Sequence, residues 1–173
     1  MEENHMRLKE CVFLVLFIFS SSEAWAMGHL SVQASNDPLI GKSAQDFMLT
    51  KTDGKSGMLI GPQKGKEVIL IFWATWCSHC YEELGAINDG LASIEEKGIK
   101  IKLVDVGETK EDVKNYFKQR HMKLVSFVDE DSIMQAKYHL IGVPTLIFID
   151  KKGIIRNVTH AFPSDYENYF SVR

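Results

Sequence analysis

The sequence predicts an α/β fold in which helices flank a mixed central sheet and a β-hairpin precedes it. Short apolar runs rich in branched and aromatic residues alternate with segments whose apolar residues recur every three or four positions, as in buried strands and amphipathic helices. The last two apolar runs are joined by a tight turn at residues 151–153, which makes them an antiparallel hairpin. This order of elements indicates a mixed sheet with helices on both faces.

The first expected elements are a hairpin, a buried strand and an amphipathic helix. Residues 46–59 predict the hairpin, with Asp53 and Gly54 at its turn. Residues 67–74 are apolar almost throughout, which is typical of a central strand that is covered on both faces. The apolar residues of the following helix recur at steps of three and four: Leu84, Ile87, Leu91 and Ile94. Gly98 ends this helix.

The rest of the chain continues the alternation. Residues 100–106 predict a second strand, and Thr109 with Asp112 forms a capping pair for a helix that carries Val113 and Phe117. The remaining predicted elements are a strand at 124–128, a helix at 132–140, strands at 145–150 and 154–162, and a terminal helix at 164–170.

The first 26 residues predict a secretory signal peptide that is cleaved after Ala26. Basic residues precede an apolar run at 11–19, and small residues precede the cleavage site. The run is short for a bilayer span, which needs about 20 residues, so a membrane-anchored form is the less favoured alternative. Translation from Met6 in place of Met1 would remove two acidic residues that are atypical of a signal peptide.

We therefore expect a signal peptide at 1–26, an extended lead-in at 27–37 and one domain at 38–173. The formal net charge is -3, and positive and negative side chains are interspersed. This pattern provides no basic stripe for nucleic acid and no polybasic patch for a membrane surface. We expect a monomer that is exported to the periplasm or otherwise secreted, with no nucleic-acid partner.

The mature chain would hold two cysteines, Cys77 and Cys80, because Cys11 lies within the predicted signal peptide. A structural disulfide usually closes a long loop, and two intervening residues constrain the unfolded chain very little. The pair falls where the central strand passes into its helix. Unsatisfied amides at a helix N-terminus carry partial positive charge, so a Cys77 thiolate is favoured there. Cys77 is thus the predicted nucleophile, and Cys80, one turn inside, the resolving thiol.

His79 lies between the two cysteines and favours a more oxidising pair. A protonated imidazole would stabilise the Cys77 thiolate, and hence the reduced form. Haem attachment would need a histidine where Tyr81 stands, and structural zinc would need further ligands that the chain does not supply as a second C-x-x-C or a paired-histidine motif. A Cu(I) site that uses the two sulfurs and one distant histidine stays open, as does a pair of inert buried cysteines.

The motif FWATWCSHC, the downstream GVPTLIFID and the KKG turn resemble thioredoxin-fold proteins, particularly the exported TlpA/ResA-like thiol-disulfide oxidoreductases. The similarity covers residues 38–162. It implies that Pro144 is the family's cis-proline, whose loop faces the two sulfurs, and that Val143 offers backbone hydrogen bonds to an extended client segment. It also implies that Trp76 shields the site.

Glu83 matches an acidic residue that lies near the second cysteine in this group. There it would manage the proton of Cys80. The assignment gains weight because Ile71 stands where cytosolic thioredoxins carry a buried aspartate. The alternative is a solvent-facing carboxylate beside Glu82. His79 occupies a place where the family usually has proline, which argues against a strongly reducing pair.

These observations predict an exported thiol-disulfide oxidoreductase without a cofactor. Its expected work is to reduce, or exchange with, disulfides of exported proteins, including apocytochrome cysteines before haem attachment, with electrons from a membrane thiol carrier. The alternatives are an oxidase or isomerase of exported proteins and a copper-binding chaperone that uses the same cysteines. A peroxidase is disfavoured, because the residues before Cys77 lack the proline-to-threonine approach of a peroxidatic cysteine.

Overall fold

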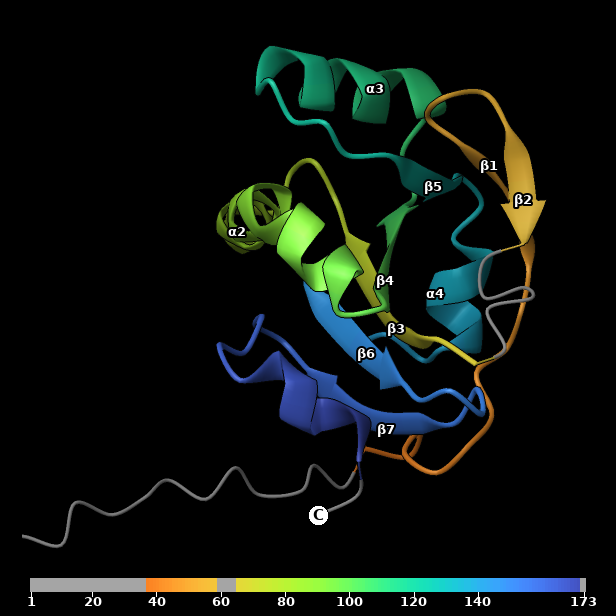
Figure 1. The fold of residues 1–173 in the computed structure, drawn as a ribbon. Coiled ribbons are helices and arrows are strands. Elements are labelled where there is room, and N and C mark those ends of the chain that lie inside the picture. Colours follow the sequence, from red (N-terminus) through yellow and green to blue (C-terminus); the bar gives the residue numbers. More distant parts are fainter. Residues whose placement is uncertain (1–36, 59–64, 172–173) are drawn as a thin grey trace, which may run out of the picture. The chain divides into compact units, whose positions relative to one another are not determined.

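The strands lie side by side in one mixed β-sheet, in the order β2-β1-β5-β4-β3-β6-β7 (Figure 1). The computed structural model describes residues 37–58 and 65–171 of the chain. Within this part the strands are β1 (Met48–Lys51), β2 (Ser56–Met58), β3 (Glu67–Trp73), β4 (Ile99–Val106), β5 (Ser126–Asp129), β6 (Thr145–Ile149) and β7 (Ile155–Thr159). The mixed sheet and its N-terminal β1–β2 hairpin confirm the predicted fold class.

The predicted signal peptide, its cleavage site after Ala26 and the lead-in as far as residue 36 lie outside the described residues. They therefore stay predictions. Among the residues that the structure does describe, no helix combines the length and the apolar character needed to cross a membrane.

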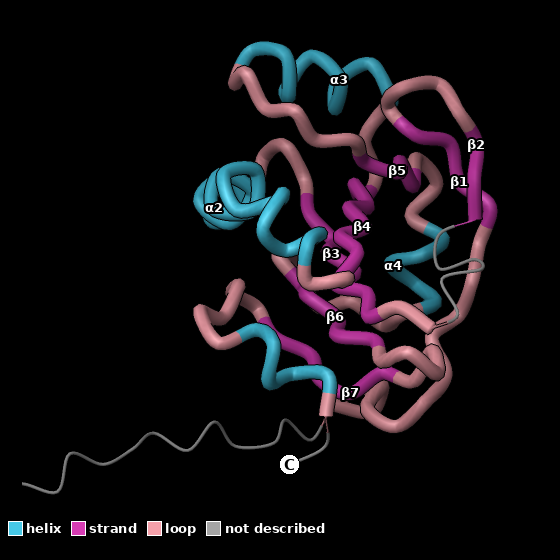
Figure 2. Tube along the Cα trace, viewed as in Figure 1, coloured by secondary structure: helices cyan, strands magenta, loops and turns pink. Residues whose placement is uncertain are grey.

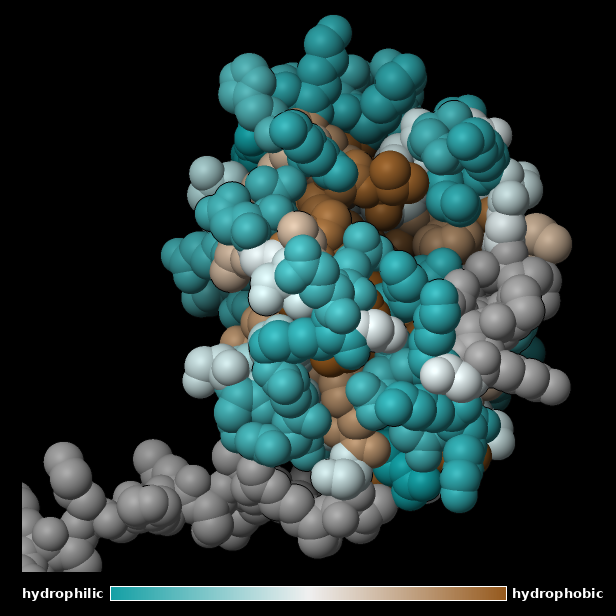
Figure 3. Space-filling model, viewed as in Figure 1, coloured by the Kyte–Doolittle hydropathy of each residue, from teal (hydrophilic) through white to brown (hydrophobic). Residues whose placement is uncertain are grey.

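Helices cover both faces of the sheet. They are α2 (Ser78–Glu96), α3 (Lys110–Gln119), α4 (Ile133–Lys137) and the 3₁₀ helix η1 (Tyr166–Phe170). Figures 1 and 2 show α2 and α3 on one side of the sheet and α4 on the other. In the space-filling view from the same side, hydrophilic residues cover most of the surface, and hydrophobic atoms show in the gaps between them (Figure 3).

The pairing of the strands places β3 at the centre. β3 pairs in parallel with β4 and antiparallel with β6, and β4 pairs in parallel with β5. The β6–β7 hairpin is antiparallel, as the turn at residues 151–153 predicts. In the β1–β2 hairpin, Gly54 has a φ of 82°, a left-handed conformation that glycine adopts without a Cβ clash. The parallel centre means that β3 and β4 end at the same edge of the sheet.

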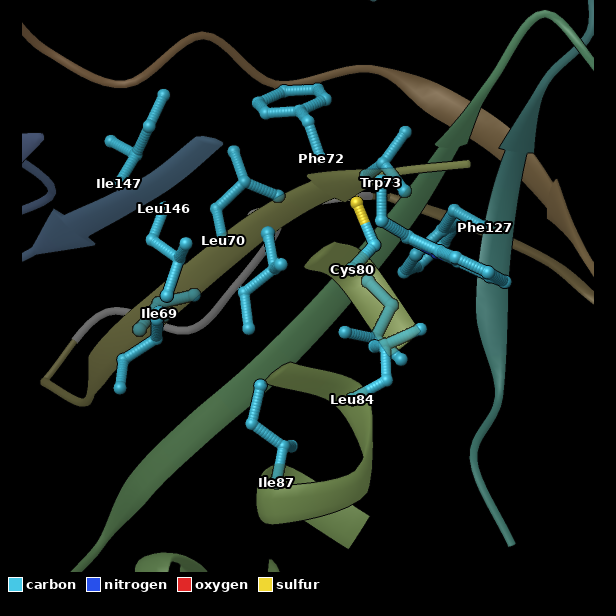
Figure 4. Close-up of a cluster of buried hydrophobic side chains, with 14 of the residues drawn as sticks. Ile69, Leu70, Phe72, Trp73, Cys80, Leu84, Ile87, Phe127, Leu146 and Ile147 are labelled. Atoms are coloured by element: carbon cyan, nitrogen blue, oxygen red, sulfur yellow. The ribbon is translucent and has the colours of Figure 1, made fainter. Parts of the chain in front are cut away.

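The core forms around β3 and the inner face of α2. Residues 68–73 are at most 1 % exposed. Cys80, Leu84 and Ile87 of α2 are fully buried and lie over β3, with Trp73 beside Cys80 (Figure 4). Burying a side chain such as Leu84 contributes about 1.5–3 kcal/mol. This packing holds the end of β3 and the start of α2 in a fixed relation.

Two helices are shorter than predicted. The helix predicted at 132–140 is the five-residue α4, because Ser132 and His139 both have left-handed backbone angles (φ 54° and 50°) that bracket it. The terminal helix predicted at 164–170 is the short η1, which is held by packing of Tyr169 and Phe170 on Phe148 (ring centroids 5.0 and 5.5 Å). Contacts with a residue distant in sequence therefore hold η1 in place, whereas local backbone angles limit α4.

Candidate active site

The two cysteines form a disulfide at the start of α2, and their Cα atoms lie 5.2 Å apart. Cys77 is the N-cap of the helix, and its Sγ accepts a hydrogen bond from the backbone N–H of Cys80 at 3.1 Å. Before the helix, the chain makes a turn in which the N–H of Cys77 donates to the carbonyl of Ala74 at 3.2 Å. The predicted position of the pair, between the central strand and its helix, is therefore the position observed.

The two sulfurs differ in access and in electrostatic surroundings. Cys77 is 7 % exposed and Cys80 is 0 % exposed, so an incoming sulfur reaches Cys77 first. The amide of Cys80 and the positive end of the 19-residue helix both point toward Cys77 Sγ, and the first turn of α2 has no acidic residue. In the reduced form these groups favour a thiolate on Cys77.

A loop before β6 faces the disulfide. The Val143–Pro144 peptide bond is cis, and the carbonyl oxygen of Val143 lies 3.5 Å from Cys77 Sγ. The hydroxyl of Thr145 donates to the carbonyl of Gly142 at 2.7 Å. These contacts bring the backbone of the predicted client-binding loop against the outer sulfur.

A groove of about 370 Å³ runs beside this loop. The residues that line it are His79, Ile141, Gly142, Val143, Pro144 and His160. The Nδ1–H of His160, the residue directly after β7, donates to the carbonyl of Pro144 at 3.0 Å and so helps to hold the loop in place. Sequence analysis did not identify His160 or Ile141 as site residues, since the pairing of β6 with β7 brings His160 to the groove.

Two large apolar side chains near the disulfide face solvent. Trp76 is 70 % exposed and Ile141 is 93 % exposed. Single exposed apolar residues are ordinary, but here one precedes Cys77 directly and the other lines the groove. Trp76 therefore presents its ring to the exterior, where a bound segment can contact it.

His79 is exposed and lines the groove together with His160. Glu83 lies one turn beyond Cys80 on α2 and is partly buried, and its Oε2 accepts a hydrogen bond from the backbone N–H of Phe162 at 2.8 Å. Glu83 thus joins the active-site helix to the segment that follows β7. Its neighbour Glu82 is exposed, so the two carboxylates have different surroundings.

A second acidic pair, which sequence analysis did not identify, lies behind the active-site turn. Both oxygens of the Glu108 carboxylate accept hydrogen bonds from Thr75, one from its N–H and one from its hydroxyl, each at 2.5 Å. Asp105 is 0 % exposed, and its Oδ1 accepts from the N–H of Glu108 at 3.3 Å. Burial, together with the neighbouring Glu108, raises the pKa of Asp105 to about 9. The available signal was an acid within the apolar run of β4.

Metal ligands are not clustered in the described part of the chain. No group of three or more His, Cys, Asp or Glu side chains there has an arrangement that could hold a metal ion. Within those residues, a copper site at Cys77 and Cys80 would have to rely on the two sulfurs.

A redox disulfide at the N-terminus of the helix after a central strand, faced by a cis-proline loop, defines a thioredoxin-fold thiol-disulfide oxidoreductase. The sequence profile of the AhpC/TSA family matches residues 40–158, and the chain belongs to this family of thioredoxin-like proteins. It is 34 % identical over 142 residues to the thiol-disulfide oxidoreductase ResA of Bacillus cereus (strain ATCC 10987 / NRS 248), which covers 81 % of this chain and 80 % of the relative. The predicted TlpA/ResA-like relationship is confirmed.

Solved structures agree with this assignment. The exposed lipoprotein thioredoxin Etrx1 of Streptococcus pneumoniae strain TIGR4 is 30 % identical with a TM-score of 0.61, over 69 % of this chain and 92 % of that one. The DsbE-type thiol:disulfide interchange protein of Chlorobium tepidum is 25 % identical with a TM-score of 0.65, over 75 % and 91 %. The protein is thus a thiol-disulfide oxidoreductase, which acts on disulfide-bearing partner proteins.

Proposed function

We propose that this protein is exported and works as a net reductase of disulfides in exported client proteins. The observation that carries the proposal is the placement of Cys77 Sγ at the N-terminus of α2, bonded to a fully buried Cys80. One sulfur can meet a client, and the other can be reached only from Cys77. This asymmetry suits a two-step exchange.

The proposed reaction conserves electrons and sulfur bonds. The Cys77 thiolate attacks a client disulfide, which forms a mixed disulfide and releases the first client thiolate. Cys80 then loses its proton and attacks Cys77 Sγ, which forms the intramolecular disulfide and releases the second client thiolate. Two electrons pass to the client. A membrane thiol carrier, the proposed donor, returns the pair to the dithiol state.

Two side chains of α2 take supporting roles in this proposal. Glu83, on the same helix and three residues beyond Cys80, accepts the proton of Cys80 in the second step and returns it on reduction. His79 tunes the potential of the pair, since a cationic ring beside Cys77 stabilises the thiolate. His79 is exposed at the rim of the groove.

The groove is the proposed client site. An extended client segment would lie along Val143 and Pro144, pair with the Val143 backbone and contact the exposed ring of Trp76. Apocytochromes whose cysteines must be reduced before haem attachment are one client class that suits this arrangement. Recognition through backbone atoms would allow clients of varied sequence.

A trapping experiment tests the proposal. Cys80→Ser leaves Cys77 able to attack and removes the resolving sulfur, so mixed disulfides with exported proteins should accumulate on non-reducing gels. Cys77→Ser, the matched control, should trap none. A copper chaperone would lose metal in both variants and trap no partner, which would contradict the proposal. N-terminal sequencing of the exported protein should begin at Met27.

The direction of electron flow is decided by the reduction potential of the pair. A value near that of cytosolic thioredoxin, about -270 mV, would support a reductase, and a value near -120 mV would indicate an oxidase. The oxidase is the second candidate because His79 lies at the groove beside the outer sulfur. His79→Ala should make the potential more negative if the ring favours the thiolate.

A further inference from the structure

The acidic pair behind the active-site turn has no part in the exchange steps described above. Asp105 ends the register of β4 against β3, opposite Trp73, and is fully buried. Glu108 holds both the N–H and the hydroxyl of Thr75. Thr75 lies in the turn in which the N–H of Cys77 donates to the carbonyl of Ala74, directly after β3. The acidic pair therefore contacts the segment that positions the outer sulfur.

The hydrogen bonding of Asp105 is incomplete for a charged carboxylate. Its Oδ1 accepts from the N–H of Glu108, whereas its Oδ2 is buried without a hydrogen-bond partner. An ionised carboxylate buried in this way is costly, but a carboxylic acid turns one oxygen into a donor. Burial and then the neighbouring Glu108 carboxylate favour a neutral Asp105, and that carboxylate can accept a hydrogen bond from a protonated Oδ2. Protonation makes Oδ2 a donor, whereas ionisation leaves it buried as an unpartnered charged oxygen.

We propose that Asp105 is a positioning residue for thiol-disulfide exchange, which acts as a neutral acid that donates its proton to the Glu108 carboxylate while Glu108 fixes Thr75 and the turn before Cys77. The shared proton leaves the pair with one negative charge in place of two. A second charge would repel the first, loosen the hold on Thr75 and oppose a thiolate on Cys77.

The surroundings of the pair reinforce this state. Asp129, at the end of β5, adds negative charge that favours a neutral Asp105, and its own carboxylate is engaged with backbone N–H groups at the start of α4. From α3, the hydroxyl of Tyr116 is buried without a hydrogen-bond partner, and burial, with a smaller contribution from the charge of Glu108, favours its neutral form. Arg120, a cation on this side, stacks on the ring of Tyr116, with its Cζ 3.8 Å from the ring centroid.

Asp105→Asn tests the proposal because asparagine keeps an N–H donor toward Glu108 at every pH and cannot ionise. The Cys77–Cys80 disulfide of the full protein is reduced with a small dithiol, which becomes a cyclic disulfide as the protein gains two thiols. The rate constant is measured from pH 6 to pH 10 for both proteins. The ratio of variant to wild type cancels the ionisation of the dithiol.

We expect this ratio to stay near one from pH 6 to 8 and to rise at least about threefold by pH 10, where wild-type Asp105 has ionised. A ratio that does not change with pH overturns the proposal. Asp105→Leu, which is similar in size and lacks the donor, should react more slowly than Asp105→Asn at every pH. Equal rates for the two variants would also overturn it.

Stability supplies a second measurement. Because the pKa of Asp105 is raised in the folded protein, unfolding releases its proton between about pH 4 and pH 9. Wild type should therefore lose stability relative to Asp105→Asn as the pH rises through this window, and urea unfolding at pH 5 and pH 8 measures the difference. A constant difference would refute a neutral Asp105.

The inference rests on exchange at Cys77, not on the proposed direction or clients. Reduction by a dithiol needs neither a client nor a membrane donor. If Cys80→Ser traps no client but the rate ratio changes with pH, the proposed function is wrong and the role of Asp105 stands. If Cys80→Ser traps clients but the ratio does not change with pH, the proposed function stands and the role of Asp105 is wrong.

Discussion

Glu83→Gln separates two properties of one carboxylate. Oε2 of Glu83 accepts a 2.8 Å hydrogen bond from the N–H of Phe162. Glutamine keeps an acceptor oxygen but loses the charge. Hydrogen bonds to charged groups contribute about 1.5–3 kcal/mol and neutral ones about 0.5–1.5 kcal/mol, so the variant should lose about 1 kcal/mol of unfolding free energy. Because Glu83 and Phe162 are both partly exposed, water can replace part of the lost interaction and keeps the loss this small.

The effect on exchange should be much larger. Glutamine cannot take or return the proton of Cys80, and general acid–base assistance is worth about 10²–10⁴-fold in rate. A loss of about 1 kcal/mol leaves a domain of this size folded, so it cannot produce such a change. We expect the resolving step to slow by about 100-fold at neutral pH and to recover at high pH, where Cys80 ionises without help.

The assay combines two measurements on each variant. The reduced protein is mixed with a small-molecule disulfide from pH 6 to pH 10, and stability is measured by urea unfolding. Glu82→Gln is the matched control, since it removes the same charge from an exposed neighbour on the same helix and should change neither quantity. If Glu83→Gln exchanges at the wild-type rate at every pH, the proton role of Glu83 is refuted. If Glu82→Gln slows exchange equally, the effect is due to net charge.

Two further predictions concern the frame around the site. Ser126→Ala removes the 3.0 Å acceptor of the buried Trp73 indole N–H and should lower the unfolding free energy by about 1–3 kcal/mol. In a Trp73→Phe background, which lacks this N–H, Ser126→Ala should be nearly neutral. An unchanged urea midpoint for Ser126→Ala would contradict this. Asp150→Ala should cost about 1–3 kcal/mol at pH 7, because Asp150 accepts hydrogen bonds from the N–H of Ile154 and from Arg156. Burial raises the pKa of Asp150, but these hydrogen bonds outweigh it and lower the pKa. Its contribution is therefore present above about pH 4 and lost as the pH falls through the folded-state pKa, so the same wild-type-to-variant difference at pH 7 and pH 3 would count against it.

The sequence predicted those parts of the site that depend on local order. The apolar run of β3 leads directly into the cysteines, and the helical spacing of Leu84 and Ile87 orients Cys80 inward. Helix physics then assigns the outer position to Cys77. The capping pair was predicted for the same local reason, since Thr109 accepts from the N–H of Asp112. Such features require only neighbours along the chain.

Features that join distant strands were not predicted. Glu108 meets Thr75 because β3 and β4 are parallel and end together, which places residues 33 positions apart in contact. His160 reaches the cis-proline loop only through the pairing of β6 with β7. The partner of Glu83 lies 79 residues away, at Phe162. Spacing along the sequence carries no record of these register-dependent contacts.

The segment after β7 contacts the active-site helix α2 at two places. Near the start of α2, Glu83 accepts a hydrogen bond from the N–H of Phe162. At the end of α2, Lys97 donates to the hydroxyl of Tyr166 at 3.1 Å and forms an ion pair with Glu167. The segment after β7 thus contacts α2 near both ends and sets the tilt of the helix. Truncating that segment, or fusing another protein to it, should therefore change the position of the helix and of the two sulfur atoms at its start.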